Sequence, residues 1–386
     1  PSYIILEVDG KLTLANRVND PVIKATSVTD VEVLGGVLDG NEANQTGDVT
    51  EGVIYFHTVT RGKIHGCHIT EGYCHGTVCI NCEDIEISGC TVDGCQANGI
   101  GISGSTTKDI LVHDNVVSEC SDVGITNYCD YVTIVNNNVH HIDNNESPFP
   151  VNSHIGIMLE GNVYTASFCT ISGNVVHDCP GSGISAGSDT NDRGSNNIIE
   201  NNRIFNVGRG INVAKCNYVS VRNNQIDTTS DNGISIANTV LNAQVIGNYL
   251  RNVADASTEF GIDVESNGAV IVGNSIITCA GIGINIVGDY CVISNNYIED
   301  INNNKQGIFL TAGSDNNVVS NNVINDCAGS SGIQLSSSGA DYNIIYGNRV
   351  ASCTAGINIG NAACDQNMVI GNILLNNTTP FNDVGT

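Results

Sequence analysis

The stretch "GINIVGDYCVISNNYIEDINNNKQ", residues 283–306, decides the fold of this 386-residue chain. It is followed without a break by "GIFLTAGSDNNVVSNNVINDCAGSS" (307–331) and "GIQLSSSGADYNIIYGNRVASCTA" (332–355). Each segment contains three short apolar runs: one that follows Gly-Ile, one in the middle, and one that follows an asparagine. Gly, Asn, Asp and Ser fill the gaps between the runs. The chain is therefore built from a repeated unit that holds three short strands.

The repeat extends over most of the chain. A glycine followed by Ile, by Val or, at Gly76, by Thr begins a unit thirteen times, at a mean spacing of about 25 residues. These glycines are Gly52, Gly76, Gly99, Gly124, Gly156, Gly183, Gly210, Gly233, Gly261, Gly283, Gly307, Gly332 and Gly356. The apolar runs are too short for helices, and alternation within a run turns one face inward. Asn and Gly tolerate the left-handed backbone of tight corners.

Three parallel strands per turn, stacked about 4.8 Å apart, predict an all-β fold, a parallel β-helix in which each turn contacts mainly its neighbours. We expect one domain over residues 1–386 with about 13–14 turns. Residues 1–51 form the N-terminal cap and first turns, a long loop is inserted at about 140–154, and 376–386 form a C-terminal tail. The isoleucines expected to stack inward are Ile102, Ile125, Ile157, Ile184, Ile211, Ile234, Ile262, Ile284, Ile308, Ile333 and Ile357.

These units resemble those of right-handed parallel β-helix proteins of the pectate-lyase-like superfamily. The opening "VTDVEVLGGVLDGNEANQTG", residues 28–47, is similar to an early turn of such proteins. The resemblance covers essentially the whole chain and implies a right-handed coil that faces glycans, secreted or at the cell surface. It is specific for the fold and not for one activity. Adjacent Asp-Asp, Gly-His-Gly and Arg-x-Pro-x-x-Arg are all absent from the sequence, so catalytic residues of polygalacturonases or pectate lyases cannot be transferred.

The charge and hydropathy of the chain restrict its partners. The formal net charge is −26, from 40 acidic and 14 basic residues. A surface this acidic repels nucleic acid and suits cations or neutral glycans. No apolar run reaches the roughly 18 residues of a membrane span. The chain starts at Pro1 without a signal-peptide pattern, so we expect a leader that was removed or a fragment.

The sixteen cysteines recur at equivalent positions of the repeat. One set ends the third run, and a second set opens the middle run, where other units carry Ile, Val or Thr. We therefore expect small buried side chains with free thiols rather than a zinc site. Disulfides between successive turns are the alternative. Free thiols suggest a reducing or anaerobic setting, which conflicts with an exported glycan-facing role.

One irregularity marks a candidate site. Unit starts are 22 to 28 residues apart except between Gly124 and Gly156, which are 32 apart. The extra residues, 143–153, include Pro148 and Pro150, which stiffen a loop. A long loop on a regular solenoid is often functional. The competing interpretation is an exposed bulge without a partner.

Aligning the repeats places charged residues around this loop. His140 aligns with His177, and His141 aligns with Glu119 and Asp178. His154 aligns with Asp122, and Arg209 follows two turns later, about 10 Å along the axis. We predict His154 or His141 as a base, with Glu160 nearby and Arg209 as the clamp for an anionic group. The predicted substrate-binding residues are Asp122, Phe149, His177, Arg193, Asp263 and Glu265.

A second candidate is the carboxylate pair Asp263 and Glu265, which alternation points outward around Val264. Two such carboxylates, roughly 7 Å apart, fit an inverting acid and base or a hard cation such as Ca2+. Solvated surface carboxylates are the plain alternative. No other cofactor or metal ligand set is predicted.

Three functions fit these features. The first is a polysaccharide lyase, glycoside hydrolase or uronate epimerase with a groove on the outer strand face. The second is a non-catalytic cell-surface solenoid or adhesin, which the regular units after Gly283 favour. The third is a viral tailspike or fibre segment, which would be a homotrimer rather than a monomer. The first is preferred because of the superfamily resemblance.

Overall fold

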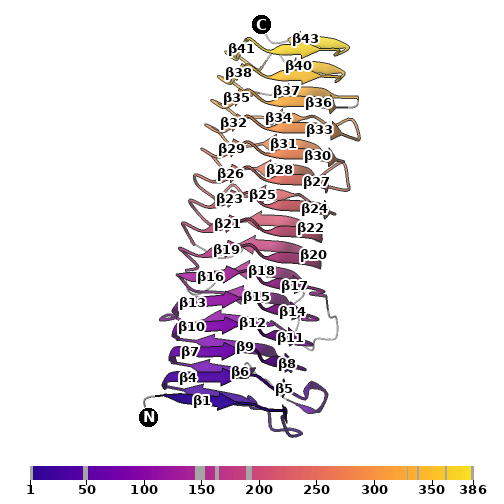
Figure 1. Ribbon diagram of the computed structural model, residues 1–386. Coiled ribbons are helices and arrows are strands. Elements are labelled where there is room, and N and C mark those ends of the chain that lie inside the picture. Colours follow the sequence, from indigo (N-terminus) through magenta and orange to yellow (C-terminus); the bar gives the residue numbers. More distant parts are fainter. Residues whose placement is uncertain are drawn as a thin grey trace. The chain divides into compact units, whose positions relative to one another are not determined.

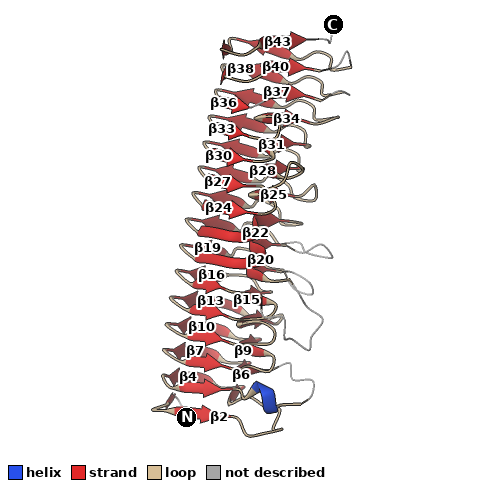
Figure 2. Ribbon diagram, turned by 90° about the vertical axis from the view of Figure 1, so that its right-hand side faces the viewer, coloured by secondary structure: helices blue, strands red, loops and turns tan. Residues whose placement is uncertain are grey.

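The chain is an all-β parallel solenoid of about 14 turns, as predicted. The computed structural model describes residues 3–46, 51–143, 153–160, 165–187, 194–327, 329–336, 339–360 and 363–383. Within these ranges the one helical element is the short 3-10 helix η1 (Glu42–Asn44), seen in Figure 2. The described residues contain no helix that is long and apolar enough to cross a membrane. The chain divides into two compact units, Pro1–Ile198 and Ile199–Thr386, and the expectation of a single domain stays a prediction.

The first unit consists of three columns of parallel strands, one for each run of the repeat (Figure 1). The first-run column contains β3 (Ile23–Thr26), β6 (Gly52–His57), β9 (His75–Ile80), β12 (Ile100–Ser103), β15 (Val123–Asn127) and β18 (Ile155–Leu159). The middle-run column contains β1 (Ile4–Glu7), β4 (Thr29–Leu34), β7 (Thr60–His65), β10 (Glu83–Ser88), β13 (Lys108–His113), β16 (Val132–Val135) and β19 (Thr170–Ser172). The third-run column contains β2 (Lys11–Thr13), β5 (Val37–Asp39), β8 (His68–Thr70), β11 (Thr91–Asp93), β14 (Val116–Ser118) and β17 (Asn138–His140). The long strand β20 (Val175–Ala186) belongs to both the third-run and the first-run columns.

The second unit repeats this plan, with β21 (Ile198–Glu200) at the boundary. Its first-run column contains β25 (Ile234–Ile236), β28 (Phe260–Val264), β31 (Ile282–Ile286), β34 (Ile308–Leu310), β37 (Ser331–Leu335), β40 (Ala355–Ile359) and β43 (Thr379–Asp383). Its middle-run column contains β23 (Ser220–Arg222), β26 (Gln244–Ile246), β29 (Val270–Val272), β32 (Val292–Ser294), β35 (Val318–Ser320), β38 (Ile344–Tyr346) and β41 (Met368–Ile370). Its third-run column contains β24 (Gln225–Thr229), β27 (Tyr249–Val253), β30 (Ser275–Cys279), β33 (Tyr297–Ile301), β36 (Val323–Cys327), β39 (Arg349–Ala351) and β42 (Ile373–Leu375). Strand β22 (Arg203–Val213) belongs to both the third-run and the first-run columns.

Stacked isoleucines fill the core, and all eleven that were predicted to point inward have no exposed surface. In the second unit the stack is in the predicted register, since Ile234 pairs with Ile262 and Ile262 with Ile284. In the first unit, one isoleucine of the predicted stack was placed two residues too late in the sequence. Ile100, not Ile102, lies opposite Ile125, and Ile102 lies opposite Asn127. Ile102 is buried as well because alternation turns both residues to the same side.

A row of buried asparagines runs along the corner before the third-run strands. In the second unit, each of these side chains accepts a hydrogen bond from the backbone N–H of the equivalent asparagine one turn earlier. The members of this asparagine row are Asn202, Asn224, Asn248, Asn274, Asn296, Asn322 and Asn348, which are buried, and Asn372, which is half-buried. The side-chain amides therefore satisfy backbone groups that a tight corner would otherwise leave unpaired.

All sixteen cysteines are buried and free. In the third-run column, Cys279 lies opposite Val253 on one side and Ile301 on the other. The thiol thus occupies a place that apolar side chains fill on neighbouring turns. This burial agrees with the expectation of a small apolar side chain rather than a metal ligand.

Candidate functional site

The predicted site residues fall into two groups and an undescribed remainder. Phe149 and Arg193 lie outside the described residues, as do Pro148 and Pro150. The first unit carries Asp122, His141, His154, Glu160 and His177. The second unit carries Arg209, Asp263 and Glu265. The scheme that joins His154 to Arg209 spans both units and stays a prediction.

His154 lies at the entry to β18, beside Asp122 on the turn before. Val123 pairs with Ile155 in register, so the predicted alignment of Asp122 with His154 is found. The Asp122 carboxylate accepts the Ser153 N–H at 3.1 Å, and its carbonyl accepts the Ile155 N–H at 3.0 Å. His154 has a left-handed backbone (φ 49°) and a buried Nε2 without a hydrogen-bond partner among the described residues. A buried imidazole nitrogen of this kind is a candidate proton acceptor.

The outward row of the first-run column is largely covered in this unit. Met158 lies between Thr126 and Ser185 in that row. It is only 8 % exposed, and Thr126 and Ser185 are buried too. Glu160 follows β18 and lies near the Tyr128 phenol, whose pKa is raised to about 12, mainly by burial and further by the Glu160 charge. The row therefore offers little open surface here.

Three histidines lie together where the third-run strands end. His140 pairs with His177 in register, as predicted, and their rings stack with centroids 4.9 Å apart. His140 Nδ1 and His141 Nδ1 are 2.7 Å apart, and the His177 Nδ1–H donates to Asp178 at 2.7 Å. Burial lowers the pKa of His140, and the charges of His177 and His141 act in the same direction. The three rings form a compact, electron-donating group, which we call the histidine cluster.

The second unit has a polar row on the outer side of its first-run column, half-buried at Asn212 and Ser235 and buried at Asp263 and Asn285. Asn212, Ser235, Asp263 and Asn285 follow one another in register. Arg209 lies beside this row, where its guanidinium donates to Asp231 at 2.5 Å and to Asn212 at 3.1 Å. The arginine is therefore held in place by one carboxylate and one amide.

Two carboxyl groups, one in this row and one beside it, have raised pKa values. Burial raises the pKa of Asp263 to about 6, and the Glu265 charge adds to the shift, whereas the Asn285 hydrogen bond and the Arg209 charge oppose it. The Asn285 side chain donates to Asp263 at 2.8 Å. Burial and a hydrogen bond with Asp231 raise the pKa of Glu259. Glu265, in contrast, is exposed and accepts the Asn238 N–H at 3.3 Å. We call Arg209, Asp231, Glu259, Asp263 and Asn285 the acidic cluster.

The alternation of β28 identified Asp263, but the sequence interpretation missed Asp231 and Glu259. Both lie two residues before a unit-starting glycine. That is the position at which Asp122 and His154 had already been aligned in the first unit. Following the same position through the later units would have placed the two carboxylates on adjacent turns. Asn285 was missed because its relation to Asp263 depends on the register of two strands.

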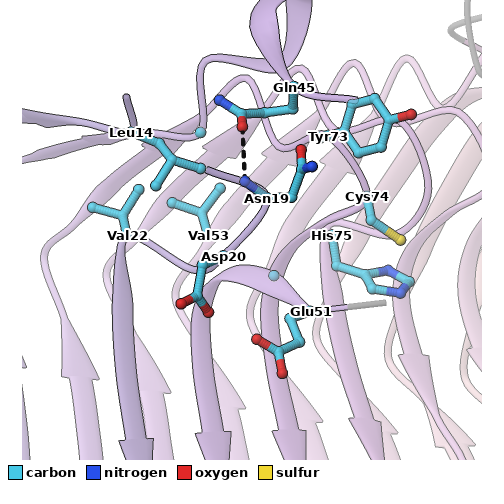
Figure 3. A pocket seen from close by; sticks show the side chains of 12 residues that line it. Leu14, Asn19, Asp20, Val22, Gln45, Glu51, Val53, Tyr73, Cys74 and His75 are labelled. Atoms are coloured by element: carbon cyan, nitrogen blue, oxygen red, sulfur yellow. Dashed lines mark hydrogen bonds between the residues drawn. The ribbon is translucent and has the colours of Figure 1, made fainter. Parts of the chain in front are cut away.

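A small pocket at the N-terminal end of the first unit is lined by Asp20, Glu51 and His75, among others (Figure 3). Asp20 and Glu51 contact Lys24 Nζ at 3.3 and 2.8 Å. Burial lowers the pKa of His75 to about 4, and its Nδ1 accepts the Asn98 N–H at 3.2 Å. The histidine is therefore neutral and serves to hold the backbone.

Comparisons with solved structures support the fold. The chain is similar to the A-module of the mannuronan C-5 epimerase AlgE6 of Azotobacter vinelandii, with a TM-score of 0.62 and 14 % identity over 83 % of this chain and 90 % of that one. The A-module of AlgE4 from the same organism gives 0.58 and 13 %, over 78 % and 87 %. The Dettilon tailspike protein gp208 gives 0.50 and 18 %, over 80 % and 62 %. At these identities the likeness establishes the fold alone.

Two family models match the sequence. One, described as right handed beta helix region, matches residues 126–291. The other, described as periplasmic copper-binding protein (NosD), matches residues 12–193 and 242–386. No curated protein gives a significant match. Since the second model covers well over half of the chain, the protein belongs to the NosD family, and its solenoid is a right-handed parallel β-helix of the pectate-lyase-like class.

Proposed function

We propose that this protein binds a polysaccharide along the outer row of the second unit and cleaves or epimerises it at the acidic cluster. The observation that carries the proposal is the state of Asp263. Its carboxyl group lies on the outward side of β28, is 7 % exposed, and has a pKa of about 6. A carboxyl group that titrates near neutrality can give or take a proton during catalysis. A solvated surface carboxylate has no reason to depart so far from its usual pKa.

The neighbours of Asp263 suit a reaction on a sugar. Asn285 fixes the orientation of the carboxyl group, and Glu259 supplies a second carboxyl group of raised pKa. A neutral glycan would need only the two carboxyl groups of Asp263 and Glu259. The carboxylate of a uronate would bind the Arg209 guanidinium in place of Asp231. The arginine would then neutralise the uronate carboxylate before the sugar loses its proton. Polysaccharide epimerisation is also the activity named for the two modules that share the fold.

The site at the long loop remains the alternative location. There His154 or His141 would be the base, Asp122 and His177 would contact the sugar, and Glu160 would assist. The unpartnered, buried His154 Nε2 favours it. The acidic cluster is preferred because its charged groups act on one another within one unit: Asp231 binds Arg209 and Glu259, and the charges of Arg209 and Asp231 act on Asp263. A Ca2+ ion between Asp263 and Glu265 is not part of the proposal.

The proposal is tested by a panel of neutral and acidic glycans. Ultraviolet absorbance reports an unsaturated lyase product, new reducing ends report cleavage, and proton exchange at C5 reports epimerisation. We expect Asp263→Asn to lower turnover by about 100-fold or more, the usual contribution of a general acid or base. The rate should also change near pH 6 in the wild type, falling above it if Asp263 is the acid and below it if it is the base. The matched control Glu265→Gln, at an exposed position two residues away, should retain activity.

Equal turnover of Asp263→Asn and wild type would place the chemistry elsewhere, with His154→Ala as the next variant. Binding without turnover on every glycan would favour the non-catalytic surface protein. Light scattering separates a monomer from the homotrimer that a tailspike or fibre segment would form. We place the protein outside the cytoplasm because the family is described as periplasmic.

Copper binding is a second candidate function, since the family's description names copper. The observation that favours it is the histidine cluster, because imidazole is a preferred copper ligand. In the part of the chain that the structure describes, however, no group of three His, Cys, Asp or Glu side chains is placed to hold a metal ion, so these three imidazoles do not fit the ion as they are arranged. The buried thiols are a poorer fit, since they lie within the apolar core.

A further inference from the structure

We infer that a cavity beside Tyr131, in the first unit, binds a neutral sugar unit of a glycan. The Tyr131 ring forms one wall of this cavity, which we call the Tyr131 cavity, and Phe168 supports the ring from its other side. Lys108 and Asp130 lie around the same cavity and bind the sugar hydroxyls. The inference rests on the proposed function for its class of ligand only, because the acidic cluster lies in the other unit.

The two aromatic side chains stand at a corner whose backbone does not favour them. Thr133 pairs with Thr170, so Tyr131 and Phe168 occupy the same position on adjacent turns. Both have a left-handed backbone, with φ values of 58° and 57°. Asn, Asp and Gly adopt this conformation most easily, and a bulky side chain in it is uncommon. Asp109, the equivalent residue on the turn before, has a φ of 57° and shows that a small polar residue is enough for the corner.

The rings are not needed for the core either. Tyr131 is 51 % exposed and Phe168 is 50 % exposed. Their rings stack face to face, with centroids 5.2 Å apart and 7° between the planes. Side chains that neither the corner nor the core requires, placed at a sparsely populated backbone conformation, point to a binding role.

The cavity lies against the face of the tyrosine that Phe168 leaves open. The described residues that line it include Tyr131 and the segment 104–108 of the turn before, but not Phe168. An aromatic face carries partial negative charge, which attracts the C–H bonds on the flat side of a sugar ring. The stacked Phe168 holds the tyrosine ring upright for this contact.

The cavity has the size and the polar groups of a small-molecule site. Its volume is about 340 Å³, within the range of roughly 300–1,000 Å³ of such sites. The Asp130 carboxylate accepts the Thr165 hydroxyl at 3.0 Å and the Ser167 N–H at 2.7 Å. Lys108 Nζ lies 3.0 Å from Glu83. A carboxylate has several acceptor positions and an ammonium group has three donor hydrogens, so both groups can also bind hydroxyls of a sugar.

The charge around the cavity favours a neutral sugar over a uronate. Asp130 lines the cavity, and the charges of Glu83 and Asp109 both act on Lys108. One cation is thus set among three carboxylates, and the sequence has no Lys or Arg between Asp109 and Asp192. A uronate would bring a further negative charge close to Asp130, which is unfavourable. A hydroxyl of a neutral sugar can instead donate a hydrogen bond to that carboxylate.

The test is the binding of oligosaccharides to the intact protein. The probes are β-1,4-linked pentasaccharides of glucose and of mannose, with an oligomannuronate of the same length as the acidic comparison. Calorimetry measures affinity, and ring-current shifts of the sugar protons in nuclear magnetic resonance report stacking. We expect a neutral probe to bind with ring-current shifts, and the oligomannuronate to show none that depend on Tyr131. Tyr131→Ala should weaken binding of the neutral probe by about tenfold, the effect of an aromatic contact.

Three further variants separate stacking from structure. Tyr131→Phe keeps the aromatic face and should bind like the wild type. Tyr131→Leu keeps an apolar side chain without that face, so it should bind as weakly as Tyr131→Ala and replaces it if the alanine variant fails to fold. The matched control is Tyr218→Ala in the second unit. Tyr218 lies six residues before Asn224, as Tyr131 lies before Asn137, with a φ of 54° and 56 % of its surface exposed.

The outcomes decide the inference without touching the acidic cluster. Weaker binding in Tyr131→Ala and Tyr131→Leu, with wild-type affinity in Tyr131→Phe and Tyr218→Ala, supports it. Wild-type affinity in Tyr131→Ala, an equal loss in Tyr218→Ala, or a wild-type protein that binds neither neutral probe overturns it. The proposed function fails by a different result, equal turnover of Asp263→Asn and wild type.

Discussion

At the scale of single residues, the paired asparagines of the repeat have two different tasks. In "SNN", residues 294–296, Asn295 has the left-handed backbone of the corner (φ 56°), and Asn296 is buried in the asparagine row. The same division holds at Asn321 and Asn322. The first asparagine is used for its tolerance of positive φ, whereas the second is used for its amide group. Two identical neighbours in the sequence are thus retained for unrelated physical reasons.

The role of the row predicts the effect of Asn296→Ala. The Asn296 side chain accepts the Asn274 N–H at 2.9 Å and donates to the Ile271 carbonyl at 3.0 Å. Its removal leaves these buried groups unpaired, so we expect the free energy of unfolding to fall by about 2 kcal/mol. Chemical denaturation measures the change. Asn238→Ala, at an exposed position, is the control and should change stability by less than about 0.5 kcal/mol; equal effects of the two would show that the row does not stabilise the corner.

Much of the residue-scale detail could be predicted, and the failures have a common cause. The inward isoleucines and outward Asp263 follow from alternation, which is local. The partners of Asp263 and Arg209 come from other turns, 22 residues away along the chain in each case. The spacing of residues in the sequence identifies such neighbours only when the register between turns is known without an error of even one residue. The assignment of Ile102 in place of Ile100 shows that a predicted register can be wrong by two residues. Burial raises the pKa of Asp263, and the spacing of residues in the sequence does not report how deeply a side chain is buried.

At the scale of elements, each strand depends on the turn before and the turn after. β31 pairs with β28 on one side and β34 on the other. The long strands β20 and β22 were predicted as separate runs, but the chain continues from the third run into the first without a gap in strand structure. The two runs are separated by three residues in β20, Pro180–Ser182, and by two residues in β22, Gly208–Arg209. The chain still turns within these strands, because Asp178 and Asn206 have a left-handed backbone, with φ values of 54° and 56°.

The dependence of neighbouring strands predicts the effect of a charge in β31. Ile284 has no exposed surface, and a buried unpaired carboxylate there should cost well over about 4 kcal/mol. We expect Ile284→Asp to unfold adjacent turns, seen as lost hydrogen-exchange protection in β28 and β34. The milder Ile284→Ala should cost about 2–5 kcal/mol. Ile277→Asp is the control, because that side chain lies between Arg251 and Glu299 on the half-buried outer side; equal damage from both aspartates would contradict the assigned faces.

At the scale of the whole molecule, an acidic exterior encloses a core rich in cysteine. The formal charge of −26 keeps the protein soluble and disfavours anionic partners. The thiols lie beneath that exterior, and burial raises the pKa of Cys129 and of Cys169 to about 12. A thiol that is protonated and enclosed is a poor nucleophile. The chain can therefore carry many cysteines without being reactive while it is folded.

Thiol titration tests this arrangement. Because all sixteen cysteines are buried and free, we expect few to react with a thiol reagent in native buffer and nearly all to react in denaturant. Unfolding exposes them and returns their pKa values to the ordinary range. A low count under both conditions, restored by reductant, would show disulfides and contradict the free-thiol structure.

The asparagine row has one more property, which concerns its direction. In the second unit every side-chain Nδ2 donates to the Oδ1 of the next asparagine along the chain, from Asn202 through Asn348 to Asn372. The amide dipoles are therefore aligned head to tail, and each polarises the next. Backbone peptide groups in an α-helix add up in the same way to a macrodipole. This all-β protein thus obtains from side chains a cooperative axial field of the kind that helical proteins obtain from their backbone.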